Sequence, residues 1–398
     1  FPSHSQLNVK MVSFLWILNV NSPFLLYYSI SFFYVFIICT KPDRYFELVN
    51  KYAVITATNK DDLIKIENDA NGNALVSLFR KKKINATELF FQKTYNPKLT
   101  REIWIYGLDD DDSFEVIGTS KKIKIRLIGG QNNDEYKIEN GKNVFLYDYK
   151  SKKNTIENVD NATVKLSDDY HLNTYDYKKL KNNTNQIIPI LGANPDDGLK
   201  IGVNDVYTMY GFERNPFTAR HQLKAAYYFA TNGFEMNYKG EFANTIGKLN
   251  LLIESNFQSA NFSQNFFGYG NETLNNDNFY GMDYNRVKVR DFGVAPSLLW
   301  KAYGGSKLYF GVYYRSVEVE ETQGRFVENN SELPQYIFES NQFVGVRSKF
   351  EFDNYDNKAY PTLGMKTAFE VGFTNSLENT KRNFVYLIPE VSFNQKMV

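Results

Sequence analysis

The stretch that decides the fold is FVGVRSKFEFDNYDNKAYPTLGMKTAFEVGF, residues 343–373. It predicts a strand, a polar turn and a second strand. Side chains alternate across a strand, so each of these strands has one apolar face and one mostly polar face. The apolar faces consist of Val344, Val346, Ser348, Phe350 and Phe352 in the first strand, and of Met365, Thr367, Phe369, Val371 and Phe373 in the second. A soluble sandwich and a transmembrane barrel both produce this pattern.

Composition favours an all-β chain and excludes several functions. The 398 residues can form two or three domains, and 16% of them are aromatic, mostly Tyr (29) and Phe (33), which favour strands. A net charge of +1 gives no reason to expect a nucleic-acid partner. Cys39 is the single cysteine, and His4, His171 and His221 have no metal-ligand spacing. We find no Walker A, GxGxxG, GxSxG or HExxH motif, so we expect no enzyme activity.

Residues 1–41 form an apolar leader of undecided status. The chain begins with Phe1, so we expect sequence to be missing at this end. The densest apolar run, residues 24–38, is short for a membrane helix, which needs about 20 residues. No positive segment follows Met11, and no small-residue cleavage site follows the run. A targeting or anchoring segment and a stretch foreign to the mature fold both stay open.

Residues 42–184 contain an internal repeat. Three copies of strand, polar turn and strand follow one another at residues 102–116, 124–138 and 143–156. One such unit cannot bury its apolar face alone, so neighbouring units must stack. We therefore predict a β-solenoid-like repeat region over residues 42–184, which ends in a last rung and a linker.

The turns of the repeats carry acidic residues. Residues 129–137 resemble the GGxGxDxUx nonapeptide of calcium-binding β-rolls, with Asn132 in place of the third glycine, and residues 107–115 fit more loosely. Calcium binds oxygens, which stacked turns supply, so the calcium candidates are Asp109, Asp112 and Asp134. Solvated turn residues explain the same acids, since Asp and Asn favour turns. Glycosidase-type catalysis is rejected, because the neighbouring carboxylates of residues 109–112 point in different directions.

Residues 185–398 read as a series of alternating strands. We count about nine of them, at residues 198–203, 221–230, 234–242, 249–257, 287–300, 308–319, 343–353, 365–374 and 382–393. Pro389 predicts an edge, a bulge or a strand end. Short connections at 231–233 and 245–247 alternate with long ones at 258–286 and 320–341. We expect short turns on one side of a transmembrane barrel and long loops on the other.

Three motifs make this region resemble the BamA/TamA superfamily of outer-membrane assembly barrels, the bacterial surface antigen family. Residues 194–202 resemble the start of the family's first strands. Residues 265–273, NFFGYGNET, resemble the family's loop N-F-x-G-x-G-N-E-T, through Asn265, Gly268, Gly270 and Asn271. Residues 352–364 resemble its D-x-R-D-N…P-x-x-G hairpin, with Tyr355 in place of arginine, through Asp353, Asp356, Asn357, Pro361 and Gly364. Turn geometry alone explains these glycines and Asx residues as well.

The repeat region is similar to the β-rich segment that precedes the barrel in Bacteroidetes members of the family. The resemblance implies more strands than this sequence offers, an R-G-F/Y loop in the lumen and a last strand that ends in an aromatic residue. Because these features, the metallophosphoesterase ligands and evident POTRA repeats are absent from the sequence, we interpret the chain as a fragment with an incomplete barrel.

The resemblance implies insertion or translocation of other proteins in the outer membrane of a Gram-negative bacterium. Such barrels act through a weakly sealed seam and local bilayer thinning, so no catalytic residue and no cofactor apart from the calcium candidates is implied. The implied partners are outer-membrane lipid and unfolded outer-membrane protein clients. Two other functions stay open. One is the barrel anchor and β-rich segment of a surface metallophosphoesterase with an upstream catalytic domain, and the other is a soluble, calcium-stabilised β-solenoid adhesin.

Overall fold

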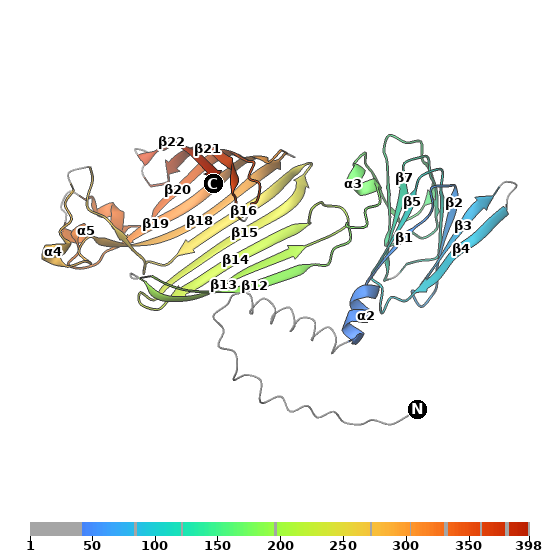
Figure 1. Cartoon of the computed structure of the whole chain (residues 1–398), viewed down its shortest axis with the longest axis horizontal. Coiled ribbons are helices and arrows are strands. Elements are labelled where there is room, and N and C mark those ends of the chain that lie inside the picture. The colour runs from blue at the N-terminus through green and yellow to red at the C-terminus, as the bar shows by residue number, and fades with distance from the viewer. Residues whose placement is uncertain are drawn as a thin grey trace, which may run out of the picture. The chain divides into compact units, whose positions relative to one another are not determined.

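The computed structural model describes residues 42–82, 86–120, 122–194, 197–270, 273–302, 304–329, 333–358, 360–378 and 382–396. The apolar leader, residues 1–41, lies outside this part of the chain. The chain divides into two compact units, with the boundary between Asp176 and Tyr177, and both units consist mainly of β-strands (Figure 1). No helix in the described ranges has the length and apolar character needed to span a membrane.

The first unit contains two β-sheets. Helix α2 (Pro42–Asn50) precedes the strands β1 (Tyr52–Thr56), β2 (Asp62–Asn68), β3 (Ala74–Lys82), β4 (Ala86–Tyr95), β5 (Glu102–Leu108), β6 (Ser113–Ile117), β7 (Lys124–Gly130), β8 (Glu135–Ile138), β9 (Val144–Asp148), β10 (Thr155–Val159) and β11 (Thr163–Leu166), and helix α3 (Tyr170–Asn173) follows them. One sheet has the order β1-β5-β7-β9-β11 and is parallel throughout. The other has the order β10-β8-β6-β2-β3-β4, and only its β2-β3-β4 part is antiparallel.

The sequence repeat corresponds to this parallel pairing. Each copy supplies one strand to each sheet, and equivalent residues of successive copies lie side by side. Ile105 pairs with Leu127 in one sheet, and Phe114 pairs with Tyr136 in the other. The β3–β4 hairpin is inserted between the first pair of strands, β1 and β2, and the second pair, β5 and β6. This insertion hides the first copy from a search for a fixed period.

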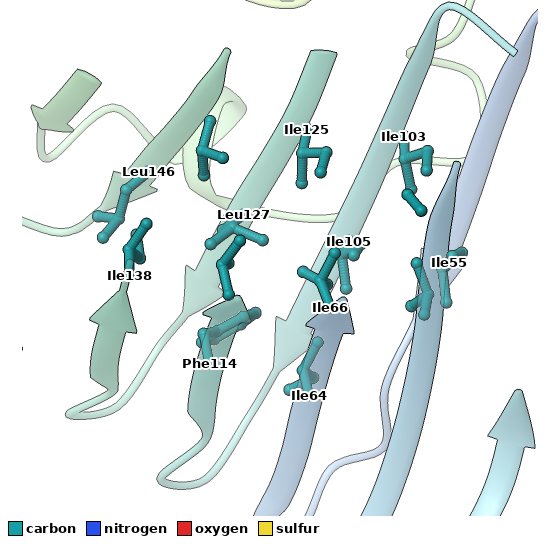
Figure 2. Packing of buried hydrophobic residues seen from close by; sticks show 14 of the residues in the cluster. Ile55, Ile64, Ile66, Ile103, Ile105, Phe114, Ile125, Leu127, Ile138 and Leu146 are labelled. Atoms are coloured by element: carbon teal, nitrogen blue, oxygen red, sulfur yellow. The ribbon is translucent and has the colours of Figure 1, made fainter. Parts of the chain in front are cut away.

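Apolar side chains from both sheets form the core of the first unit. The strands are short, and their inward positions hold β-branched and aromatic residues, which pack well on a pleated surface. Ile64 and Ile66 of β2 pack with Ile103 and Ile105 of β5, and all four are fully buried (Figure 2). The cluster continues through Ile125 and the following strands, so it extends along the whole stack.

The second unit is a single antiparallel sheet of eleven strands. Its strands are β12 (Thr184–Asn194), β13 (Gly198–Met209), β14 (Ala219–Tyr228), β15 (Gly233–Ile246), β16 (Leu249–Gln258), β17 (Ser263–Asn265), β18 (Arg286–Lys301), β19 (Ser306–Glu320), β20 (Asn341–Asp353), β21 (Leu363–Ser376) and β22 (Phe384–Gln395). They pair in chain order, except that the short β17 pairs with β18 beside β16. Figure 1 draws them as one continuous curved sheet.

The strand count differs from the predicted nine because β12 and β17 were missed. In β12 the run Ile187–Leu191 contains apolar residues at successive positions and Pro189, so it lacks the period of two. Proline is tolerated there because β12 stands at the end of the strand order. Pro389 lies in β22 at the other end of that order, which confirms the predicted edge position. Strand β17 has three residues, too few for a periodic signal.

The distribution of loops is partly different from the expected one. Antiparallel pairing places the connections β12–β13, β14–β15, β16–β18, β19–β20 and β21–β22 at one end of the sheet, and β13–β14, β15–β16, β18–β19 and β20–β21 at the other. The two long connections share the first end and hold α4 (Asp277–Tyr280), α5 (Phe326–Asn329) and the 3-10 helix η1 (Gln335–Phe338). The short turn at 231–233 also lies at that end. The prediction that short turns and long loops occupy opposite ends of the sheet is therefore wrong for this turn. The four connections at the second end have two to nine residues.

Truncation of the first unit's core should cost far more stability than truncation at its surface. Ile125→Ala removes a fully buried side chain, and we expect the free energy of unfolding to fall by about 2–5 kcal/mol. Ile117→Ala is the matched control, because Ile117 is 41% exposed. Urea unfolding followed by the fluorescence of the buried Trp104, with Trp16 and Trp300 replaced by Phe, measures both variants. Equal losses would contradict the position of the core.

Candidate functional site

One face of the second unit is apolar and exposed. Along each strand, alternate side chains are apolar and lie on one face of the sheet, which we call the apolar face. Neighbouring strands continue this face, as in the row of paired residues Val312, Val346, Phe373 and Val385. Strand β16 contributes half-buried side chains. The exposed members are Ile187, Leu191, Leu199, Ile201, Leu223, Tyr227, Phe234, Met236, Phe292, Trp300, Leu308, Phe310, Val312, Val346, Phe350, Phe369, Val371, Phe373, Val385, Leu387, Val391 and Phe393.

The apolar face also carries a cluster of aromatic rings. His221 of β14 stacks beside Tyr207 of β13 and contacts the rings of Tyr238 and Phe242 in β15. The His221 Nδ1 and Tyr238 hydroxyl are 2.8 Å apart and share a hydrogen bond. Rings with a polar group are typical of the level where a membrane meets water.

The opposite face, which we call the polar face, carries charged side chains that pair across several strands. Arg347 of β20 donates to Glu254 of β16 at 3.0 Å, although β18 and β19 lie between these strands. Lys239 also contacts Glu254, at 2.9 Å. Arg315 binds Asp291 through two hydrogen bonds of 2.9 and 3.2 Å. Side chains three strands apart meet only on the inside of a curve, so the polar face is concave.

Glycines on the polar face make room for these long side chains. Arg347 stands directly opposite Gly311 in β19 and Gly372 in β21. A methyl group on Gly345 would overlap the ring of Tyr313, and one on Gly372 would overlap the ring of Tyr386. The rings therefore lie over the glycines, which is a known way to bend and register a sheet. Tyr313 also contacts Thr374 of β21, across β20.

The curvature encloses a cavity of about 800 Å³ on the polar face. Its charged lining residues balance almost completely, with four cations and three anions: Lys224, Lys239, Arg315, Arg347, Glu254, Asp291 and Glu370. Tyr313 and Tyr386 add hydroxyl groups.

The predicted hairpin motif forms the turn between β20 and β21. The Asp356 carboxylate accepts hydrogen bonds from the Thr362 hydroxyl at 2.6 Å and from the backbone N–H groups of Thr362 and Leu363 at 3.0 Å each. These bonds hold the pKa of Asp356 well below its usual value, with the Thr362 hydroxyl the largest cause. Asn357 accepts from the Tyr360 N–H at 3.2 Å. Gly364 has φ 124°, which a side chain would disfavour.

The remaining residues of this motif lie at its borders. Asp353 ends β20 and contacts Lys307 at 3.3 Å and Lys358 at 3.2 Å. Pro361 lies in the turn, before β21 begins at Leu363. The structure therefore brings the motif together as a turn.

The predicted loop motif follows β16. Asn265 lies in β17 opposite Arg286, and Gly268 and Gly270 have φ of 107° and 93°. Asn271 lies outside the described residues. The loop packs on the other long connection, because Phe326 contacts the rings of Phe266 and Tyr284 and its N–H donates to the Tyr284 carbonyl at 2.8 Å.

A ladder of buried acidic residues runs through the first unit. Asp112, Asp134 and Asn154 directly precede β6, β8 and β10, and Asp62, the first residue of β2, occupies the equivalent position. The Asp62 N–H donates to Asp112 Oδ1 at 2.8 Å, the Asp112 N–H to Asp134 Oδ1 at 2.9 Å, and the Asp134 N–H to Asn154 Oδ1 at 2.9 Å. Each side chain thus binds the backbone of the preceding rung.

The second carboxylate oxygens of this ladder face glycines. Asp112 Oδ2 lies against Gly107, and Asp134 Oδ2 lies against Gly129, where a methyl group would overlap them. Both oxygens are buried and have no hydrogen-bond partner among the described residues. Asp148, one rung further, occupies the position equivalent to Gly129 and accepts from the Tyr136 hydroxyl at 2.6 Å.

The environment of the ladder favours the protonated acids. Burial is the largest cause in each case, and it raises the pKa of Asp112 to about 8. The pKa values of Asp134 and Asp148 are also raised, and these two neighbours share a proton more readily than they both ionise. Asp111 and Tyr136 face the same region, and Lys81 and Arg80 approach it only at its Asp112 and Asp62 end.

The structure does not bring the three calcium candidates together. Asp109 lies in an exposed turn, whereas Asp112 and Asp134 point inward against glycine backbone. Across the described ranges, no group of three or more His, Cys, Asp or Glu side chains has the arrangement of a metal site. Calcium binding stays a prediction from the sequence.

Sequence reasoning missed Asp62, Asp148 and Asn154 as partners in the ladder, and Glu254 and Arg347 as the link across the sheet. A signal for the ladder exists in the spacing, because Asp112 and Asp134 each follow a glycine by five residues, Gly107 and Gly129. The link across the sheet has no local signal, since its residues are 93 positions apart.

Comparisons with known proteins give a distant structural likeness. No family model matches the chain, and no curated protein matches it. Among solved structures, the crystal structure of BamA from Haemophilus ducreyi lacking POTRA domains 1–3 is similar over 52% of this chain, with 11% identity and a TM-score of 0.34. The chain spans 36% of that protein's length. A likeness at this level supports no inference about function.

Stability of the first unit should fall as the pH rises. Asp112 and Asp134 have folded-state pKa values above their unfolded value of 3.8, so their stabilising contribution is present below pH 4 and is lost as the pH rises to about 8. We expect the free energy of unfolding to decrease by on the order of 3 kcal/mol over that interval. Urea unfolding at several pH values, followed by Trp104 fluorescence, measures it.

Asp134→Asn should flatten this pH dependence, because the amide keeps an acceptor for the Asp112 N–H and carries no titratable proton. Asp110→Asn is the control, since Asp110 lies in the exposed turn. An unchanged slope in Asp134→Asn, or a stability that rises with pH in the unaltered chain, would contradict the protonated ladder.

A methyl group at Gly345 should destabilise the second unit. The overlap with the Tyr313 ring forces a shift on the polar face, and we expect Gly345→Ala to cost about 1–3 kcal/mol. Gly304→Ala is the matched control, because nothing lies within 4 Å of a methyl group there. Thermal unfolding of the chain in detergent micelles compares the two. A Gly345→Ala variant as stable as the control would show that the ring does not need the glycine.

Proposed function

We propose that the second unit is a wall of a membrane-spanning β-barrel in the outer membrane of a Gram-negative bacterium. The observation that carries this proposal is the apolar face, which leaves large apolar side chains exposed on strands from β12 to β22. Soluble monomers rarely expose contiguous apolar patches larger than a few hundred Å². Lipid is the surrounding that makes such a face favourable.

Strand length and pairing support the same proposal. Apart from β17, the strands have 10 to 16 residues, and about 9–11 tilted residues cross the apolar part of a bilayer. Antiparallel neighbours satisfy the backbone groups that lipid cannot. The polar face with its paired charges then corresponds to the wet lumen. The end without the two long loops would face the periplasm, and the end with them would face outward.

We further propose that this barrel belongs to the BamA/TamA type and helps other proteins to insert into or cross the outer membrane. The Asp356 turn and the loop with Gly268 and Gly270 are the motifs that support it. The proposed partners are outer-membrane lipid and unfolded client proteins. This role involves no bond chemistry, so we propose that the chain is not an enzyme. Equivalent residues pair between successive copies in the first unit, and we infer from this that it is a β-solenoid.

The first test is the location and heat-modifiability of the unaltered full chain. We expect it in the outer-membrane fraction, and we expect folded, unheated protein to migrate differently from heated protein in SDS gels. Recovery in the soluble fraction without a shift on heating would overturn the proposal.

A charge on the apolar face should weaken membrane folding. Phe310 is 60% exposed in the middle of β19, and Phe310→Arg should cost about 2–4 kcal/mol in folding into lipid vesicles. Phe279→Arg is the matched control, because Phe279 is also strongly exposed but lies in the long loop outside the strands. Equal folding of the two variants into vesicles would show that β19 does not face lipid.

A further inference from the structure

The first unit contains a pocket that the proposed membrane role does not use. It has a volume of about 250 Å³ and lies where stacked turns meet the segment after α3. Its lining residues are mostly amide, hydroxyl and aromatic side chains: Asn59, Tyr106, Leu108, Asp109, Gln131, Asn173, Thr174 and Tyr175. All of them belong to the first unit.

Successive rungs supply the polar rim of this pocket. Asn59 and Asp109 lie side by side as a parallel bridge, and the Gln131 N–H donates to the Leu108 carbonyl at 3.2 Å. The side chains of Asn59, Asp109 and Gln131 are exposed. Asp109 Oδ1 accepts from the Asp110 N–H at 3.1 Å and from Asn132 Nδ2 at 3.3 Å, so a ligand would use the other carboxylate oxygen and the two amide groups. The rung spacing thus sets three polar side chains in a row.

Asn173 has an unpaired acceptor in the wall of the pocket. Its side chain is 2% exposed, its Nδ2 donates to the Ser167 carbonyl, and its Oδ1 is buried with no hydrogen-bond partner among the described residues. An unpaired buried acceptor costs free energy, and a donor from a ligand or a water would remove that cost. The wall of the pocket therefore contains an unsatisfied hydrogen-bond acceptor.

Two tyrosine rings form the apolar part of the pocket. Tyr106 is buried, and its ring meets that of Tyr175 edge-on with 5.2 Å between centroids. Tyr175 is 39% exposed, so part of its ring is free to contact a flat ligand.

Leu108 holds a strained backbone at this pocket. Its φ is 89°, which bulky residues avoid, whereas its counterpart in the next rung is Gly130, with φ 128°. Leucine thus occupies a position where glycine would relieve the strain. Leu108 also lines the pocket. Strain of this kind concentrates at functional sites.

We propose that this pocket binds one sugar residue of a neutral glycan. Amide, carboxylate and hydroxyl groups in a row match the hydroxyls of a sugar ring, and an aromatic ring matches its apolar C–H face. The volume lies just below the roughly 300–1,000 Å³ of pockets for drug-sized ligands, which suits a single ring. Asp109 is the one carboxylate in this lining, which holds no Lys, Arg or His, so an anionic ligand would meet repulsion.

The test measures sugar binding to the full chain. The detergent must have no sugar head group, such as lauryldimethylamine oxide, because maltosides and glucosides would compete. The probes are glucose, galactose, mannose and N-acetylglucosamine, with glucuronate as the anionic comparison, observed by saturation-transfer NMR and calorimetric titration. We expect at least one neutral sugar to bind at millimolar concentration and glucuronate to bind less well.

Two variants with matched controls locate the binding. Tyr175→Ala and Asp109→Asn should each weaken binding about tenfold, or about 1.4 kcal/mol. Tyr177→Ala and Asp110→Asn should leave it unchanged, since neither residue lines the pocket. Circular dichroism and Trp104 fluorescence confirm that the variants are folded. The absence of binding by any neutral sugar, or equal binding by the two variants and their controls, would overturn the proposal.

A second arm identifies the source of the glycan. Polysaccharide extracted from the surface of the source cell and a soluble dextran are compared as competitors of the monosaccharide that binds. Competition by either one supports the site and names its source. Competition by the surface extract that persists in Tyr175→Ala would place binding elsewhere on the chain and overturn the proposal. These results do not depend on heat-modifiability, so the pocket and the membrane proposal fail separately.

Discussion

Alternation of side chains across β-strands is the constraint on which the second unit depends. A period of two residues gives each strand two different faces, and antiparallel pairing joins equal faces into a continuous surface. A shift of one residue in any strand would place its apolar side chains on the concave face, beside the Arg347–Glu254 pair. The charges on one face and the exposed apolar side chains on the other therefore specify the same register. The glycines at 311, 345 and 372 then permit curvature, because they remove bulk on the concave side only.

The first unit solves a different problem, since its strands are parallel and its turns must stack. Buried backbone N–H groups in the turns between strands need hydrogen-bond partners inside the protein. Asp112, Asp134 and Asn154 provide them from the following rung. Carboxylates are costly in such a place, because several of them in low dielectric repel one another. Protonation reduces this repulsion, and Gly107 and Gly129 leave the space that the second carboxylate oxygens of Asp112 and Asp134 occupy.

Sequence alone predicted the elements that have a regular period. The strand pairs in 343–373 and the repeat copies at 102–116 and 124–138 have such a period, and both were found with nearly the observed bounds. Strand β12 was missed because an edge strand with Pro189 is not forced to alternate. The turn at 231–233 was assigned to the wrong end of the sheet because the length of a turn does not show at which end it lies. That end depends on the number of strands that precede the turn. The ladder required knowledge of which turns stack, and the β3–β4 insertion conceals this for Asp62.

In the first unit, the positions at which the repeat copies agree differ in role from the positions at which they do not. Where the copies agree, as at Ile105 and Leu127, the side chains are buried and supply stability. Some of the differences are buried, as at the paired Trp104 and Arg126, and others are exposed. Leu108 is the counterpart of Gly130. Asp109 follows Leu108, and Gln131 follows Gly130. One side of the stack is therefore chemically distinct at each rung. A repeat needs no such variation for stability, and the strain at Leu108 works against it. The departure from the repeat at Leu108, rather than the repeat itself, therefore distinguishes the turns that line the proposed pocket.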